Sequence, residues 1–176
     1  MTSPDPVKEA EAYRRSLLAA LGTDDPAVAQ AATPGVIRAL IAEAGPDLRT
    51  RPEPGEWSVL ECISHLVDGE LVVAGRYRWI LAHDEPDIVG YDQARWVDRL
   101  RHNEDDVEEL LSVFEALRAA NIALWGRLTE KDRARVGIHR ERGPESIDLT
   151  FHLAGGHDRV HLDQARRALA TARQRG

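Results

Sequence analysis

One segment determines how the rest of this 176-residue chain folds, and it reads Trp57-Ser58-Val59-Leu60-Glu61-Cys62-Ile63-Ser64-His65-Leu66-Val67-Asp68-Gly69-Glu70. Ser58 and Glu61 match a capping box, in which each side chain satisfies a free backbone N–H group at the start of a helix. Trp57 stands just before the cap, where it can pack against the first turn. Apolar side chains then recur at helical spacing until Pro86 interrupts them. We therefore predict a helix from Ser58 to about His83.

Helix-period patterns also dominate outside this segment, whereas strand signals are weak. Pro and Gly residues cluster at a few points, which mark the connections. The predicted helices cover about residues 6–21, 26–44 with a break or kink at Pro34-Gly35, 91–128 with a break near His102-Asn103, and 146 or 148 to 172. The connection over 129–145 includes a short extended piece at Val136–His139. We expect an all-α fold, a four-helix antiparallel bundle that forms a single domain over residues 1–176.

Composition and charge narrow the class of partner. The formal net charge is -7 and no basic stripe stands out, which argues against nucleic acid. A single cysteine, Cys62, excludes an intramolecular disulfide and fits a reducing compartment. No apolar run approaches the roughly 20 residues that cross a bilayer, and Met1 to Ala10 lacks a signal-peptide pattern. We expect a soluble, cytoplasmic protein that acts on a small molecule and contacts neither nucleic acid nor membrane.

A second segment carries candidate metal ligands. His157 and His161 are four residues apart, so on a helix they lie one above the other, on the same side as Leu153. His152 falls on the charged side instead. Two neutral imidazoles at this spacing form half of a site for zinc, nickel or a related ion. Spacing alone supports ordinary core histidines equally well, and the zinc-protease pattern H-E-x-x-H is absent.

Two glycines stand immediately before this pair. Gly155 and Gly156 lie inside the predicted helix, where each glycine costs about 1 kcal/mol relative to alanine. We expect something to approach the helix backbone closely there, either a neighbouring helix or a substrate.

The first segment offers a third imidazole and two carboxylates. His65 lies at the edge of the apolar stripe of its helix, where a hydrogen-bonding histidine is the commoner outcome. Glu70 falls near the middle of that stripe, and a buried carboxylate is costly unless it is paired. An arginine would be the ordinary partner, and a catalytic base beside a metal is the alternative. Glu61 is the other candidate for moving a proton.

We expect the other notable polar residues to have structural rather than catalytic roles. Cys62 is one turn before His65 and is expected to be a small buried hydrophobe. Asn121 lies in the apolar stripe of its helix and needs a partner, which we expect on another helix. His83, His102 and His139 fall near helix ends or in loops, and we interpret them as surface residues.

The two segments together resemble a known family. Residues 57–70 resemble the W-S-x-x-E-x-x-x-H-L-x-x-x-E segment of DinB-like (YfiT-type) proteins, and residues 157–164 resemble their closing H-x-x-x-H-x-x-Q. The loop that contains Arg51-Pro52-Glu53-Pro54-Gly55 is similar too. One departure is Val160, because the family often has a histidine in that position. The resemblance extends from the first helix to about Leu169.

This resemblance implies both a fold and a metal centre. It implies a four-helix bundle with up-down-down-up connections, and metal ligands at His65, His157 and His161. The ion would be divalent, most often zinc or nickel, and many relatives are thought to form homodimers. The wider superfamily includes metal-dependent transferases that use low-molecular-weight thiols such as mycothiol or bacillithiol, and a maleylpyruvate isomerase.

Three hypotheses for function follow. The first is a metal-dependent enzyme, either a thiol S-transferase or a hydrolase, in which Glu70 or Glu61 moves the proton. The second is a non-catalytic protein that binds a metal or a small ligand. The third is a metal-free helical interaction module in which His65 never meets the other two histidines.

Overall fold

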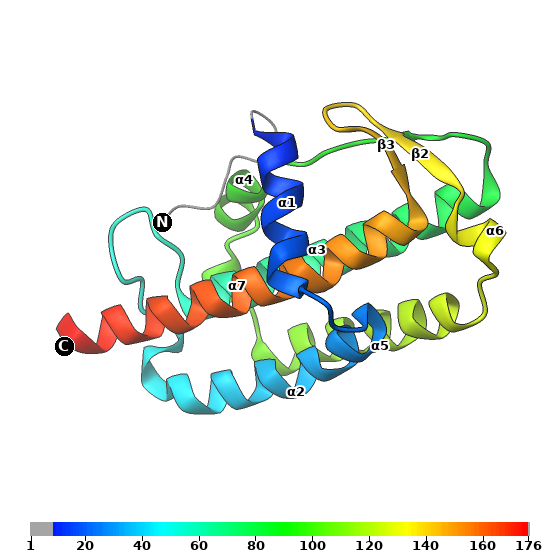
Figure 1. Ribbon diagram of the computed structural model, residues 1–176. Coiled ribbons are helices and arrows are strands. Elements are labelled where there is room, and N and C mark those ends of the chain that lie inside the picture. The colour runs from blue at the N-terminus through cyan, green and yellow to red at the C-terminus, as the bar shows by residue number, and fades with distance from the viewer. Residues whose placement is uncertain (1–8, 176) are drawn as a thin grey trace.

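The computed structural model describes residues 9–175, which form a helical bundle with one small sheet (Figure 1). In chain order the elements are α1 (Ala10–Leu21), α2 (Pro26–Ala44), the 3₁₀ turn η1 (Gly45–Arg49), α3 (Val59–Ala82), β1 (Asp87–Ile88), α4 (Gln93–Arg99), the 3₁₀ turn η2 (His102–Glu104), α5 (Val107–Gly126), α6 (Glu130–Arg133), β2 (Val136–His139), β3 (Gly143–Ser146) and α7 (Ile147–Arg175).

The four long helices α2, α3, α5 and α7 form the bundle. The helices α2 and α7 run in one direction and α3 and α5 run in the other, which is the predicted up-down-down-up order (Figure 1). The fold class expected from sequence is therefore confirmed. No helix within residues 9–175 is long and apolar enough to cross a membrane.

Helix bounds follow the local chemistry closely. The capping box at the start of α3 is present in full: the Ser58 hydroxyl accepts from the Glu61 backbone, and the Glu61 carboxylate accepts from the Ser58 backbone. Pro34 does not end α2, which is continuous from Pro26 to Ala44. The predicted break near His102 is real, since η2 separates α4 from α5. The first helix begins at Ala10, and the earlier part of its predicted range lies outside the described residues.

A small sheet closes one end of the bundle. Its strand order is β1-β2-β3, with β1 parallel to β2 and β2 antiparallel to β3. The extended piece expected at Val136–His139 is strand β2, but β1 and β3 have no clear pattern in the sequence. Strand β1 has only two residues, and β3 begins with Gly143-Pro144, which is typical of a turn rather than a strand.

The apolar core fills the centre of the bundle. The main cluster includes Ile37 of α2, Ile63 of α3, Phe114 of α5 and Leu162 of α7. The helix α1 crosses α7 outside this core (Figure 1). It approaches so closely that a Cβ atom at Gly156 would lie 2.0 Å from the carbonyl oxygen of Leu17. A neighbouring helix, rather than a substrate, thus accounts for this glycine.

Two histidines interpreted as surface residues are in fact buried. His102 is 6% exposed, because η2 turns its ring inward to contact Asp68 at 2.7 Å and Asp105 at 2.9 Å. His139 is 1% exposed, because it lies on the inner face of β2. Position outside the long helices did not predict exposure for either residue, because each side chain points back toward the bundle. His83 is exposed as expected.

Candidate metal centre

Three imidazole rings meet between α3 and α7. One ring nitrogen from each of His65, His157 and His161 can be chosen so that all three atoms lie within 4.8 Å of one another. The Nε2 atoms of His65 and His157 are 3.0 Å apart. Two nitrogens that bind the same ion at about 2.0–2.1 Å each lie about 3.0–3.4 Å apart. The three imidazoles are thus a donor set for one divalent metal ion, and the His65–His157 pair already has the spacing of two ligands of one ion.

Local structure explains why these rings converge. His65 is on α3, one turn after the capping-box glutamate that fixes the start of this helix. His157 and His161 are one turn apart on α7, which packs extensively along α3. The indole of Trp57 lies 5.1 Å from the His65 ring and 6.0 Å from the His161 ring, measured between centroids. The indole therefore forms one wall of the histidine cluster.

Burial keeps the three imidazoles neutral. It lowers the pKa of His157 to about 4. Burial, together with the neighbouring histidines, also lowers the pKa of His65 and His161 well below 6.5. A metal ion binds only the neutral imidazole, so the cluster is already in the protonation state that a metal requires at neutral pH.

A glutamine orients one of the three histidines. The Oε1 atom of Gln164 lies 2.9 Å from Nδ1 of His161. An amide oxygen only accepts hydrogen bonds, so Nδ1 carries the proton and the lone pair of Nε2 is free for an ion. Gln164 is part of the closing motif in the sequence, but the motif alone does not show that it contacts His161. By contrast, Nδ1 of His65 is buried and has no hydrogen-bond partner within residues 9–175.

The cluster opens onto a pocket on the side of α7 that faces the hairpin β2–β3. His157 lines this pocket, together with Glu70 and Arg76 of α3 and Tyr91 of the segment before α4. Its volume is about 100 Å³. Gly69 leaves space for the imidazole of His157, since a Cβ atom at position 69 would lie 3.3 Å from Cε1 of that ring.

Glu70 lies in the pocket wall and is ion-paired. Its carboxylate contacts Arg118 at 2.8 Å and accepts a hydrogen bond from Asn121 at 2.7 Å. Burial raises the pKa of Glu70, while Arg118 lowers it. The ordinary partner expected for this carboxylate, an arginine, is thus present. The partner expected for Asn121 on another helix is Glu70.

Arg118 joins α3 and α7, the two helices that carry the three histidines, and it was not singled out from the sequence. Besides Glu70 of α3, it contacts Asp158 of α7 at 2.5 Å and donates to the backbone carbonyl of Gln30 at 3.0 Å. Asp158 also accepts a hydrogen bond from Thr33 at 2.8 Å. An arginine within the apolar stripe of α5 was the available signal, because such a cation needs buried carboxylates.

Glu61, the other carboxylate with a predicted catalytic role, has a different environment. It is buried, it accepts from the Ser58 backbone at 2.8 Å, and it forms a bidentate ion pair with Arg51. It does not line the pocket beside His157. In this position Glu61 fixes the start of α3 and joins it to the preceding loop.

Comparison with known proteins settles the family. The sequence profile of the DinB superfamily matches residues 28–165, a range that contains all three histidines. The chain belongs to the DinB superfamily. The family predicted from the two sequence segments is therefore confirmed.

Individual relatives of this DinB-superfamily chain carry related names. Two proteins of Oceanobacillus iheyensis, each named "Putative metal-dependent hydrolase", are 30% identical over 115 residues and 24% identical over 116 residues. These alignments cover 65% and 66% of this chain, and 66% of each relative, just under two thirds of its length. YfiT from Bacillus subtilis, described as a "probable metal-dependent hydrolase with an unusual four-helix bundle topology", superimposes with a TM-score of 0.73. It shares 19% identity, over 99% of this chain and 94% of YfiT, so it supports the fold.

Proposed function

We propose that this protein is a metal-dependent hydrolase in which His65, His157 and His161 bind one divalent ion, zinc or nickel. The observation that carries the proposal is the convergence of three neutral imidazoles beside a pocket. Three protein ligands leave at least one coordination position for water or substrate, as catalytic sites do and structural sites do not. The names of the relatives from Oceanobacillus iheyensis support the same reaction class.

The chain's own residues have distinct roles in this proposal. When bound, the ion lowers the pKa of a coordinated water and polarises the bond to be cleaved. Glu70 accepts the proton, and Arg118 stabilises its ionised form beforehand. Gln164 keeps His161 in the tautomer that binds through Nε2. Burial raises the pKa of the Tyr91 hydroxyl, so Tyr91 remains a hydrogen-bond donor to a substrate oxygen.

Thiol transfer is the second candidate reaction, and the arginines of the pocket wall favour it. The same coordination position would accept a thiolate, and metal binding activates a thiol by lowering its pKa. Arg76 and Arg142 line the pocket and suit the carboxylate of a low-molecular-weight thiol. Bacillithiol, which carries free carboxylates, is the thiol to test, and mycothiol, which has none, is the comparison.

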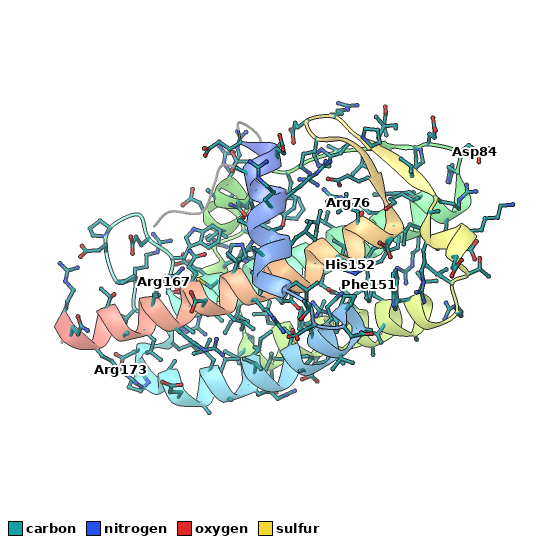
Figure 2. All side chains as sticks on the ribbon, in the orientation of Figure 1. Arg76, Asp84, Phe151, His152, Arg167 and Arg173 are labelled. Carbon is teal, nitrogen blue, oxygen red and sulfur yellow. The ribbon has the colours of Figure 1, made fainter. Side chains whose placement is uncertain are left out.

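Metal analysis of tag-free protein tests the shared basis of both reactions. We expect about one equivalent of zinc or nickel in the wild type, and loss of this metal in His157→Ala and His161→Ala. His152→Ala is the matched control, because His152 lies on the same helix but its ring bonds to the backbone carbonyl of Asp148, and we expect this variant to retain the metal (Figure 2). Wild-type protein that stays metal-free after incubation with both ions would refute the proposal.

Activity assays then separate the candidate reactions. Nitrophenyl esters test hydrolysis, and thiols paired with an electrophile test transfer. Activity should disappear with a chelator and return with the ion. Glu70→Gln should keep the metal but lose about 100- to 10,000-fold in rate. Full activity in His161→Ala would remove the metal mechanism, and bound metal without either activity would favour a non-catalytic binding protein.

A further inference from the structure

Arg76 is a buried cation without a counter-ion among residues 9–175. Its side chain is 8% exposed. One terminal nitrogen, Nη2, donates to the carbonyl oxygen of Val89 at 3.2 Å, and Nε is buried without a hydrogen-bond partner. No carboxylate in the described part of the chain forms an ion pair with it. A guanidinium in this position is costly unless an anion reaches it.

The carboxylates of the pocket wall are already paired with other groups. Glu70 and Asp158 are ion-paired with Arg118. Glu145 is held by Arg142 at 2.6 Å and by Arg14 at 3.0 Å, so two cations share one carboxylate. Glu141 lies at the partly exposed rim, where its nearest partner is a ring nitrogen of His139 at 3.8 Å. The end of the pocket that contains Arg76 therefore has an excess of positive charge.

Arg76 lines the pocket about two turns of α3 away from Gly69, which borders His157. It is seven residues after Gly69, so both lie on the same face of α3, about 10 Å apart along the axis. The segment from Val89 to Tyr91 connects the two ends of the pocket. The Val89 carbonyl accepts from Arg76, and the Tyr91 hydroxyl lies 3.9 Å from the Cβ position of Gly69, beside His157. Figure 2 places Arg76 on the hairpin side of α7.

We infer that the pocket binds a slender substrate that carries a carboxylate, which Arg76 binds while the reacting group lies at the histidine cluster. The inference rests on the proposed function and adds a substrate class to it. A guanidinium binds a carboxylate with paired, charge-assisted hydrogen bonds, and the orphaned Nε of Arg76 is one such donor. The volume of about 100 Å³, against the roughly 300–1,000 Å³ of drug-sized sites, suits a narrow chain inside the pocket, and any larger part of a substrate would extend outside it.

Binding to metal-free protein tests the anion site independently of the metal. The probes are hexanoate and hexanol, which share a carbon chain and differ in charge, followed by NMR titration. We expect wild-type protein to bind hexanoate at least about tenfold more tightly than hexanol. In Arg76→Gln the ratio should fall to about one, and Arg76→Lys should recover part of it. Arg173→Gln is the control, because Arg173 is a half-exposed arginine on α7 that contacts Glu43 and Asp47 instead (Figure 2).

A second titration measures the distance between the two ends of the pocket. The nickel-loaded protein is titrated with mercapto acids from mercaptoacetate to mercaptohexanoate and with the matching mercapto alcohols, followed by charge-transfer absorption. We expect the preference for the acid to increase with chain length, because only the longer acids reach Arg76. Arg76→Gln should abolish this increase while nickel binding stays unchanged.

The outcomes separate this inference from the proposed function. Absence of any preference for hexanoate in the wild type would overturn the inference, and this comparison needs no variant to fold. A preference that persists in Arg76→Gln would overturn it too. A preference for hexanoate in a protein that binds no metal would leave the anion site standing and refute the proposed function. Metal-dependent activity without any carboxylate preference would support the proposed function and refute the anion site.

Discussion

Replacing Gly156 by alanine tests how closely α1 packs against α7. The new Cβ atom would lie 2.0 Å from the carbonyl oxygen and 2.6 Å from the carbonyl carbon of Leu17. Carbon–oxygen contacts are normally about 3.3 Å or longer, so α1 must withdraw by more than about 1 Å. The obstacle is backbone, which no change of rotamer relieves.

The magnitude follows from two opposing effects. Overpacking costs about 1–3 kcal/mol, and contact with backbone places Gly156→Ala at or above the upper end of this range. The better helix propensity of alanine returns about 1 kcal/mol. We expect a net loss of about 2 kcal/mol in the free energy of unfolding, which corresponds to a Tm lower by about 4–8 °C for a chain of this length.

The neighbouring glycine provides the matched control. A Cβ atom at Gly155 would lie 3.2 Å from Cδ1 of Leu21, the end of a flexible side chain that can rotate away. Gly155→Ala should therefore change stability by less than about 1 kcal/mol. Urea denaturation followed by far-UV circular dichroism measures both variants. Equal stability of the two variants would refute the packing argument.

Three further predictions concern charge, pH and capping. Arg118→Leu leaves two buried carboxylates without a cation and should cost about 3–5 kcal/mol in urea denaturation; stability equal to wild type would contradict the bridging role. Burial lowers the pKa of His102, but its bonds to Asp68 and Asp105 raise the pKa above 6.5 overall. Their stabilisation is complete below about pH 6.5 and is lost as pH rises through the folded-state pKa, so the urea midpoint should fall with pH in wild type and vary less in Asp68→Asn. Ser58→Ala removes a cap that also donates to Asn103, and it should lower Tm by an amount that corresponds to about 1–2 kcal/mol, whereas Ser58→Thr should retain most of the stability.

The sequence predicts the helices well because their signals are local. The capping box at Ser58 and the apolar periodicity of α3 and α7 each depend on residues within a few turns. The spacing of His157 and His161 placed them on the inner face of α7 for the same reason. The meeting with His65 could not be derived from spacing, because it depends on how two helices pack. It was expected only through the resemblance to DinB-like proteins.

Charged residues in the interior were the least predictable part. Glu70 stood out as a carboxylate in an apolar stripe, but its partner Arg118 lies 48 positions away on another helix, and nothing local identifies the pair. His102 and His139 were misplaced because loop residues can point inward as readily as outward. Arg76 was one arginine among many until the fold enclosed it. Such residues depend on the tertiary structure, which local patterns do not encode.

The proposed ligands His65 and His157 are separated by 92 positions, which sets the order in which they become available while the chain is made. At about 5–20 residues per second, the ribosome adds the second imidazole roughly 5–20 s after the first. A nascent chain that has only α3 offers a single imidazole, which cannot retain an ion against the other chelators of a cell. In the proposed function, an ion is therefore loaded only after the bundle has closed.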